Sequence, residues 1–313
     1  MRRRLPVLLA AAVLLAGASP ALTAQEPHLA ILRGKLAAEL TRVADAFDGV
    51  AGIHVMDLTS GERFGVNDEL VFPQASAIKV VILLELFRRA ETEPELRRRR
   101  IELTDDVRTG GSGVLQVLTD GGSALSLEDH AIYMILHSDN TSTNILIDEL
   151  GMDAINRLAT SLGAPGTRVQ RRMIDPESSA AGRENVSTPR EAAGIMERIA
   201  SCDLPMSEAS CERVREILEI PKGGPVREPL PGSLRVAFKP GGITGVATVW
   251  ALVDLPGRPY VLTVMANYGG DGNAVVEAAS AAAYGYFSKL AGATPHGTRV
   301  PLDVLRRAGP GGG

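Results

Sequence analysis

The sequence predicts an α+β fold in which both ends of the chain build one antiparallel sheet around an inserted block of helices. Three observations predict it. Residues 50–58 alternate apolar and polar side chains, turn at TSGE and return at 63–70, which is the pattern of a β-hairpin. Residues 233–268 hold three further strand-like runs, SLRVAFKPG, ATVWALVDL and PYVLTVMANY. The stretch between them, from Ser76 to about Ile220, has helical periodicity and helix caps instead.

The helices follow along the chain, most of them with a boundary signal. We expect them at Leu29–Ala46, Leu127–His137 after a Ser126-x-x-Asp129 cap, Asn144–Leu150 before Gly151, Ala154–Leu162 before Gly163, from the capping box Thr188-Pro-Arg-Glu191, and at 274–290. Residues 166–188 show no clear periodicity. Loops of that length inside compact domains are usually functional, so this loop is a candidate part of a site.

The elements divide the chain into four parts. We expect a signal peptide at 1–24, a discontinuous sheet domain at 25–72 and 233–293, a helical domain at 73–232 that includes the long loop, and a tail at 294–313. The sheet domain and the helical domain meet in a cleft, and such clefts favour binding sites.

The N-terminus predicts export. MRRR is a basic segment, the apolar LPVLLAAAVLLAGA is too short to span a bilayer, and cleavage is expected near Leu22 or Gln25. No cysteine lies near that junction, which argues against a lipid anchor, and we expect a periplasmic or secreted protein. In an oxidising compartment the two cysteines, Cys202 and Cys211, predict a local disulfide worth about 2.5–3 kcal/mol; two buried free thiols are the alternative.

Composition and motif content exclude several classes of function. The net charge of −4 argues against a nucleic-acid partner, for which a basic stripe would be expected. HExxH, a P-loop and GxSxG are all missing from the sequence, and the two cysteines have no nearby histidine to complete a zinc site. We therefore expect no metal, no cofactor and no membrane span after the signal segment, and a monomer that binds a small molecule.

A serine and a lysine three residues apart stand at the start of a very apolar run, FPQASAIKVVILLELF. Ser76 is expected in the first turn of a helix, where the helix dipole favours developing negative charge, and Lys79 lies one turn further on the same face. A desolvated lysine can lose its proton and accept that of the serine, whereas arginine cannot. By itself the pair is a weak signal and favours a polar start to a buried helix over a catalytic pair.

Two further groups share this chemistry. Ser138-Asp139-Asn140 is predicted in a short corner between two helices and offers a hydroxyl and an amide. Lys239-Pro240-Gly241, followed by Gly242, lies on a predicted strand, where the lysine supplies positive charge and the glycines allow a ligand close to the backbone. Together the three groups offer a serine with a base, a second hydroxyl that can shuttle a proton, an amide that can hold a substrate carbonyl and a positive charge for an anionic substrate.

In order and spacing the three groups resemble class A β-lactamases, within the serine penicillin-recognising enzymes, whose marks are S-x-x-K, S-D-N and K-T-G. The likeness extends through SDNTSTNILIDELG, STPREAA and GRPYVLTVMANY. It implies a β-lactamase/transpeptidase-like fold, with an antiparallel sheet, flanking helices and an inserted all-helical domain.

The resemblance also implies roles for individual residues. Ser76 would be the acylated nucleophile and Lys79 its activator, while Ser138 would pass a proton to the leaving nitrogen. The remaining implied roles are substrate binding by Asn140 and Lys239, an oxyanion hole from the backbone N–H groups of Ser76 and Gly242, and anchoring of the 166–188 omega loop by Asn144.

The sequence departs from the family at two positions. Pro240 replaces the hydroxyl residue of K-T-G, and Thr244 is a candidate substitute for that hydroxyl. The omega loop has Asp175-Pro176 where the family has Glu-Pro, so Asp175 is the expected deacylation base, with Glu177 and Glu184 as rivals. A purely structural loop carboxylate is the other alternative.

Three functions fit these residues. The first is a periplasmic serine hydrolase that opens β-lactam rings and then hydrolyses the Ser76 acyl-enzyme. The second is a D-alanyl-D-alanine carboxypeptidase or esterase that acts on a peptidoglycan-like substrate with the same acylation residues. The third is a binder that is acylated with little turnover.

Overall fold

The computed structural model describes residues 20–118, 122–294, 296–299, 301 and 304. Its centre is a five-stranded antiparallel sheet in the order β2-β1-β9-β8-β7. The strands are β1 (Val50–Asp57), β2 (Arg63–Val66), β7 (Arg235–Ile243), β8 (Val246–Asp254) and β9 (Tyr260–Asn267). The first hairpin and the three C-terminal strands therefore join in one sheet, which confirms the predicted fold class. In register, Val50 of β1 pairs with Asn267 of β9, so the two ends of the chain meet directly.

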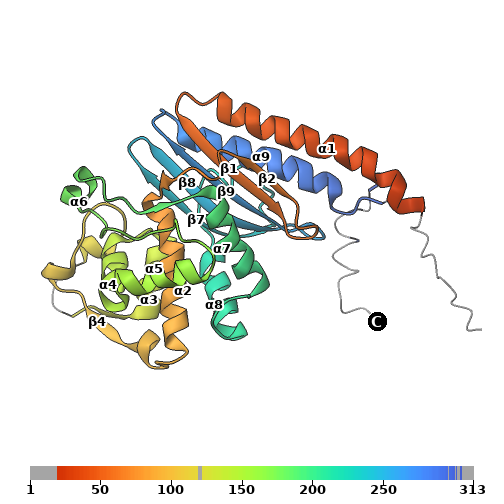
Figure 1. The fold of residues 1–313 in the computed structure, drawn as a ribbon. Helices are drawn as coiled ribbons and strands as arrows, with labels where there is room; N and C mark the ends of the chain where they lie inside the picture. Colours follow the sequence, from red (N-terminus) through yellow and green to blue (C-terminus); the bar gives the residue numbers. More distant parts are fainter. Residues whose placement is uncertain (1–19, 119–121, 295, 300, 302–303, 305–313) are drawn as a thin grey trace, which may run out of the picture.

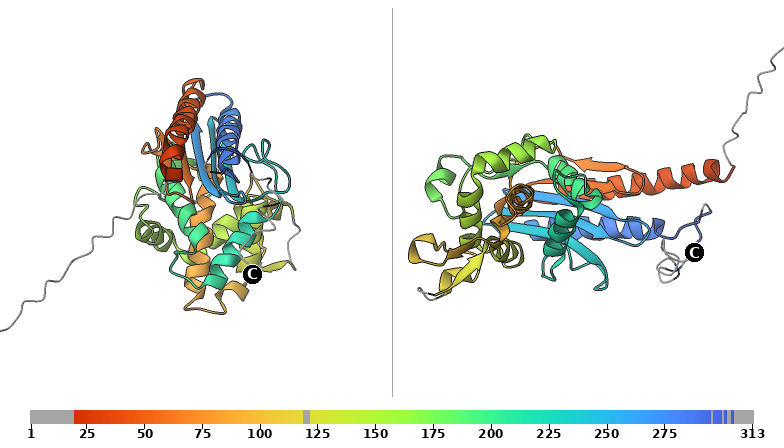
Figure 2. Two further views of the ribbon diagram at one scale, coloured as in Figure 1. Left: turned by 90° about the vertical axis from the view of Figure 1, so that its right-hand side faces the viewer. Right: turned by 90° about the horizontal axis from the view of Figure 1, so that it is seen from below.

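One face of the sheet is covered by helices from the two ends of the chain. Helices α1 (Pro20–Asp45) and α9 (Gly272–Leu290) lie side by side on it, and the two views of Figure 2 show the same arrangement. Strand residues on this face, such as Ile53 and Val264, pack with Leu40 of α1 and Ala279 of α9 in one buried hydrophobic cluster. Helix α1 starts earlier than the predicted Leu29, and α9 nearly matches the predicted 274–290.

The other face of the sheet packs against the helical block (Figure 1). Helix α2 (Lys79–Ala90) runs through the centre of this block, and only Arg88 and Arg89 of its side chains escape full burial. It packs against α3 (Leu127–Leu136), α4 (Asn140–Leu150), α5 (Met152–Ser161) and α8 (Glu208–Glu219). The same block also contains α6 (Pro176–Ala180) and α7 (Pro189–Ser201). A helix that is apolar on every side is stable only when surrounded, so α2 requires this shell of neighbours.

The stretch predicted as helical also contains short strands and 3₁₀ turns. These are β3 (Phe72–Pro73) paired with β6 (Val186–Ser187), β4 (Arg100–Glu102) paired with β5 (Ala124–Ser126), and the turns η1 (Ala75–Ile78), η2 (Leu96–Arg98), η3 (Asp105–Val107) and η4 (Leu115–Val117). The strands are two or three residues long, too short for a visible alternation. The predicted helical block is therefore present, and these short pairs and turns lie beside and between its helices.

Helix caps explain two further boundaries. The reciprocal box of Ser126 and Asp129 is present at the start of α3, as predicted. Helix α4 begins at Asn140 rather than Asn144, because the Asp139 carboxylate caps it through the Ser142 N–H at 2.8 Å.

The capping box predicted at α7 is only half formed. The Thr188 hydroxyl accepts the Glu191 N–H, but the Glu191 carboxylate turns to the Gly166 N–H at 2.8 Å and the Thr167 hydroxyl at 2.9 Å. It thereby satisfies a loop amide instead of its own helix end. As a result, the two ends of the 166–188 loop are held together.

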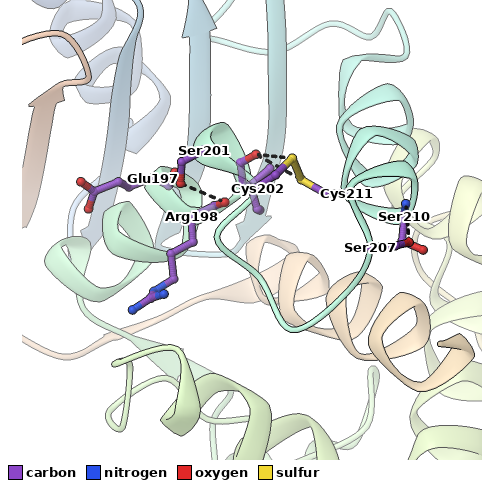
Figure 3. The surroundings of a disulfide bond; sticks show 8 residues. Glu197, Arg198, Ser201, Cys202, Ser207, Ser210 and Cys211 are labelled. Atoms are coloured by element: carbon purple, nitrogen blue, oxygen red, sulfur yellow. Dashed lines mark hydrogen bonds between the residues drawn. A yellow bond between two sulfur atoms is a disulfide. The ribbon is translucent and has the colours of Figure 1, made fainter. Parts of the chain in front are cut away.

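The disulfide prediction is confirmed. Cys202 ends α7 in a left-handed conformation, and its sulfur is bonded to Cys211 of α8, with the two Cα atoms 5.7 Å apart. Figure 3 shows the bridge closing the loop between the two helices. Among the described residues, no helix is long and apolar enough to cross a membrane. Most of the predicted signal peptide, at 1–19, and most of the predicted tail fall outside the described residues.

Removing the disulfide should lower the free energy of unfolding. The bridge closes a loop with a sequence separation of 9, for which chain entropy gives about 2.5–3 kcal/mol. We expect the free energy of unfolding of the Cys202→Ala/Cys211→Ala variant to be lower by that amount, so its urea midpoint should lie at a lower concentration. Reductant should shift the wild-type midpoint and leave that of the variant unchanged. Equal midpoints for the two proteins would show that the bridge does not stabilise the fold.

Candidate active site

Ser76 stands on a strained turn that leads into the central helix. It lies in η1, directly before α2, and the residue in front of it, Ala75, has a φ of 45° in the left-handed region. Such a conformation in a non-glycine residue is costly and is concentrated at functional sites. Among the described residues nothing hydrogen-bonds the Ser76 hydroxyl, and the side chain is only partly buried. The free N–H groups of this first turn favour negative charge.

Lys79, one turn after Ser76, is completely buried. Its Nζ donates to the Ser138 carbonyl at 2.7 Å, to the Ser138 hydroxyl at 3.2 Å and to Asn140 Oδ1 at 3.1 Å. Burial lowers the pKa of Lys79 to about 7, and the nearby Asp139 charge opposes that shift. A large fraction of this amine is therefore neutral near neutral pH, as a general base must be.

The three residues of the corner 138–140 make different hydrogen bonds. Ser138 has a φ of 53°, so the chain turns sharply between α3 and α4 at the residue that meets the lysine. Asp139 is fully buried and accepts hydrogen bonds from the N–H groups of Ser142 and of Leu115, the latter at 2.9 Å. Asn140 uses Oδ1 for Lys79 and donates through Nδ2 to the Gly110 carbonyl at 3.0 Å. The corner is therefore rigid.

Lys239 approaches the same serine from the sheet. Its Nζ donates to the Ser138 hydroxyl at 3.2 Å and to the Pro240 carbonyl at 2.8 Å. Burial, followed by repulsion from Lys79 and Lys222, holds the pKa of Lys239 well below its usual range. Two lysines thus share one hydroxyl, and no carboxylate among the described residues hydrogen-bonds either of them. An anionic ligand would relieve that repulsion, so the site favours negative charge.

The strand geometry explains why proline is tolerated at position 240. Strand β7 is at the edge of the sheet, and Pro240 faces Val249 across the ladder. Because proline has no N–H, this pair must be of the non-hydrogen-bonded kind, whose backbone groups point away from the neighbouring strand. Pairs alternate in kind, so Gly242, two residues on and opposite Ala247, also points its N–H outward from the open edge.

Gly241 allows the sheet to touch the turn that carries Ser76. A Cβ atom on Gly241 would lie 2.5 Å from the Gln74 carbonyl oxygen and 2.6 Å from the Ala77 nitrogen. Real Cβ atoms do not approach that closely, so glycine is required for β7 to pack here. Thr244 lies exposed in the turn after β7, where its side chain hydrogen-bonds none of the described residues.

Asn144 fastens the omega loop by both atoms of its amide. It donates to the Met173 carbonyl at 3.1 Å and accepts the Met173 N–H at 2.8 Å. The next residue, Ile174, has a φ of 54°, and the chain then turns into α6.

The three carboxylates considered for deacylation lie beyond this fastened point. Asp175 caps α6 through the Ser178 N–H at 2.9 Å, and this hydrogen bond lowers the pKa of Asp175. Glu177 is exposed, and Glu184 forms an ion pair with Arg171 at 2.8 Å. Hydrogen bonds therefore join Lys79, Ser138, Asn140 and Lys239, and Ser76 lies one turn before Lys79 in the chain. Among the described residues, the side chains of Ser76, Asp175, Glu177 and Thr244 form no hydrogen bond with that group.

Sequence reasoning missed the residues that support the nucleophile from behind. Gln74 is fully buried and contacts Trp250, and Thr248 donates its hydroxyl to the Gln74 carbonyl at 2.9 Å. The one available signal was a glutamine inside the otherwise apolar segment before Ser76.

A cavity elsewhere in the molecule is a weaker candidate site. Its volume is about 580 Å³, and it lies where the ends of α7 and β8 meet α8. Most of its charged lining residues are already paired, as Arg198 is with Asp203. The site around Lys79 and Lys239 is the better candidate, because no carboxylate among the described residues forms an ion pair with either lysine.

Comparisons with known proteins agree with this geometry. Residues 35–287 match the model of the beta-lactamase enzyme family. The chain is 26% identical over 276 residues to beta-lactamase L2 of Stenotrophomonas maltophilia, a match that covers 81% of this chain and 89% of that protein.

Solved structures show the same likeness. The beta-lactamase of Sphaerobacter thermophilus superposes with a TM-score of 0.74 at 29% identity, covering 82% of this chain and 97% of that one. PBP-A superposes with a TM-score of 0.74 at 26% identity, covering 81% and 96%, and a mutant of PBP-A has been solved as an acyl-enzyme complex with penicillin G. With a family model matched over most of its length, the chain belongs to the beta-lactamase enzyme family, as a divergent class A member.

Proposed function

We propose that this protein is an exported serine hydrolase that opens β-lactam rings through an acyl-enzyme on Ser76. The observation that carries the proposal is the pair of buried lysines on the Ser138 hydroxyl, with the pKa of Lys79 lowered to about 7. Family membership and the activities named for the relatives support the same reaction. The disulfide supports an oxidising compartment outside the cytoplasm.

In the acylation step, neutral Lys79 takes the proton of Ser76 as the serine oxygen attacks the lactam carbonyl. The negative charge that forms on the carbonyl oxygen is held by the N–H groups of Ser76 and Gly242. Each such donor is worth about 3–4 kcal/mol where tested in serine enzymes. Ser138, in hydrogen-bond contact with both lysines, passes a proton to the leaving nitrogen, and Lys239 faces the carboxylate of the substrate.

Deacylation is the weaker half of this mechanism. We propose Asp175 as the carboxylate that activates water, with Glu177 as the alternative. One Asp175 oxygen is occupied by the Ser178 N–H, and the side chain is a methylene shorter than glutamate. Asp139 is the carboxylate whose charge acts on Lys79. Slow hydrolysis of the acyl-enzyme is therefore expected.

This weakness favours one second candidate function. A D-alanyl-D-alanine carboxypeptidase or esterase would use the same acylation residues on a peptidoglycan-like substrate and would release β-lactams slowly. The likeness to PBP-A, a mutant of which forms a penicillin G acyl-enzyme, supports it. Comparing the turnover rates of a chromogenic cephalosporin and of a D-alanyl-D-alanine peptide decides between the two functions. Both assays use the protein as the expected monomer.

Substituting the nucleophile tests the proposal directly. We expect Ser76→Ala to abolish covalent labelling by a penicillin, as measured by the mass of the intact protein, because Ser76 is the serine that lies one helical turn before buried Lys79. The fold should be unchanged by circular dichroism. A penicillin adduct of unchanged amount on the Ser76→Ala variant would exclude this serine as the nucleophile.

The rate of acylation should depend on the protonation of Lys79. A group with a pKa of about 7 is mostly protonated below that pH, so the rate at saturating penicillin should fall about tenfold per unit below pH 7 and level off above it. Lys79→Arg should be slow at every pH, because arginine stays protonated. A flat wild-type profile between pH 5 and 8 would contradict a base at this position.

Asp175 can be tested by trapping. Asp175→Asn should leave acylation measurable and slow the disappearance of the adduct at least tenfold, because a misplaced or missing base costs about that much or more. Time-resolved mass spectrometry after mixing with a cephalosporin follows both steps. Glu177→Gln serves as the matched control. If Glu177→Gln traps the adduct and Asp175→Asn does not, the role belongs to Glu177.

A further inference from the structure

The turn that carries the nucleophile needs support. Ala75 has a φ of 45°, and an L-residue in the left-handed region costs roughly 1–2 kcal/mol. Such strain persists only where neighbouring contacts over-determine the backbone. The residue directly before Ala75 is Gln74, whose side chain is completely buried.

The Gln74 amide joins three separate parts of the fold. Its Oε1 accepts the indole N–H of Trp250, in β8, at 2.8 Å. Its Nε2 donates to the Phe72 carbonyl, in β3, at 2.9 Å, and lies 3.0 Å from the Met265 sulfur in β9. The Ser187 carbonyl, where the omega loop ends in β6, is 3.5 Å from the same nitrogen.

The neighbours fix which way this amide points. The indole N–H of Trp250 is only a donor, so it must face the amide oxygen. The carbonyls of Phe72 and Ser187 are only acceptors, so they must face the amide nitrogen. Glutamine supplies an acceptor and a donor on one planar group, which a carboxylate or a thioether of similar length does not.

The backbone of Gln74 is held as firmly as its side chain. Its N–H donates to the Asn185 carbonyl at 2.8 Å, close to the end of the omega loop. Its carbonyl accepts the Thr248 hydroxyl and the Ala77 N–H, each at 2.9 Å. The contact that excludes a side chain at Gly241 is with this same carbonyl. The sheet, the omega loop and the start of η1 therefore all converge on one residue.

We propose that Gln74 is a positioning residue that holds the left-handed turn at Ala75, and with it the Ser76 hydroxyl, in the geometry required for acylation. The proposal rests on the function assigned to Ser76 above. Gln74 acts through the backbone and does not touch the substrate. Trp250, the single tryptophan of the chain, is its principal side-chain partner.

Three variants separate positioning from simple stability. Gln74→Met removes the amide and leaves the Trp250 N–H without a partner, whereas Trp250→Phe removes the N–H together with part of the buried indole ring. The double variant removes both partners, so adding Gln74→Met to Trp250→Phe should cost less stability than adding it to wild type. Acylation of each is measured as the rate of penicillin adduct formation at saturating penicillin, and stability as the urea midpoint.

We expect Gln74→Met to acylate about a hundredfold more slowly than wild type, the cost typical of a misplaced reacting group. Trp250→Phe should stay within about threefold, because the bonds from Gln74 Nε2 and the backbone remain. The double variant should lose less stability than the two single variants lose in sum, and it should remain slow. If the double variant acylates as fast as Trp250→Phe, or if Gln74→Met acylates at the wild-type rate, Gln74 has no positioning role.

A fourth variant decides the question even if Gln74→Met fails to fold. In Gln74→Glu, a protonated carboxyl can still accept from Trp250 and donate to the Phe72 carbonyl, and burial raises its pKa. Its acylation rate, per folded molecule, should approach that of wild type at pH 5.5 and fall progressively behind as the pH rises. A ratio to wild type that does not change with pH overturns the proposal.

The proposed function has its own control in the same assays. Wild-type protein must form the penicillin adduct and Ser76→Ala must not. If wild type is not labelled, the assignment of Ser76 fails. If wild type is labelled and the Gln74 variants match it at every pH, only the inference about Gln74 fails.

Discussion

The burial of two lysines around one serine hydroxyl sets the conditions for the rest of the site. Lys79 and Lys239 both reach the Ser138 hydroxyl, and both have lost nearly all contact with solvent. A buried ammonium is expensive unless it is paired, so both side chains are pushed toward the neutral form. The same desolvation makes Lys79 available for the role of base proposed above and leaves the site attractive to an anion. The apolar helical shell around α2 produces it.

The sheet and the helical block have to meet without side chains in the way, and the sequence around β7 allows this. Gly241 leaves room for the backbone of the Ser76 turn. The backbone nitrogen of Pro240 faces the open edge of the sheet, so the N–H that proline lacks costs no hydrogen bond between strands. The departure from the family's K-T-G is therefore neutral for the sheet. It removes a hydroxyl from the site, and among the described residues the exposed Thr244 forms no side-chain hydrogen bond.

The omega loop is well anchored, and two of its carboxylates have partners inside the loop. Asn144 holds the backbone of Met173, and Glu191 holds the start of the loop at Gly166. Asp175 follows two residues later and serves as a helix cap. Anchoring and chemistry are thus separate properties of this loop. The first depends on backbone amides, which every residue supplies, and the second on the direction of one short side chain.

The sequence by itself determined the elements whose signals are local. Alternation in residues 50–58 and strand-like runs between turns predicted the strands of the sheet, and Ser126 and Asp129 predicted the start of α3. The motifs containing Ser76, Ser138 and Lys239 predicted a site. All of these signals act over a few residues. Only the tertiary structure decided the pKa of Lys79, the role of Gln74 and the direction of Asp175. Desolvation and buried hydrogen bonds are set by residues far apart in the chain: Lys79 and Ser138 are separated by 59 positions, and Gln74 and Trp250 by 176. No local pattern encodes such distances, since they arise only when the sheet closes on the helical block.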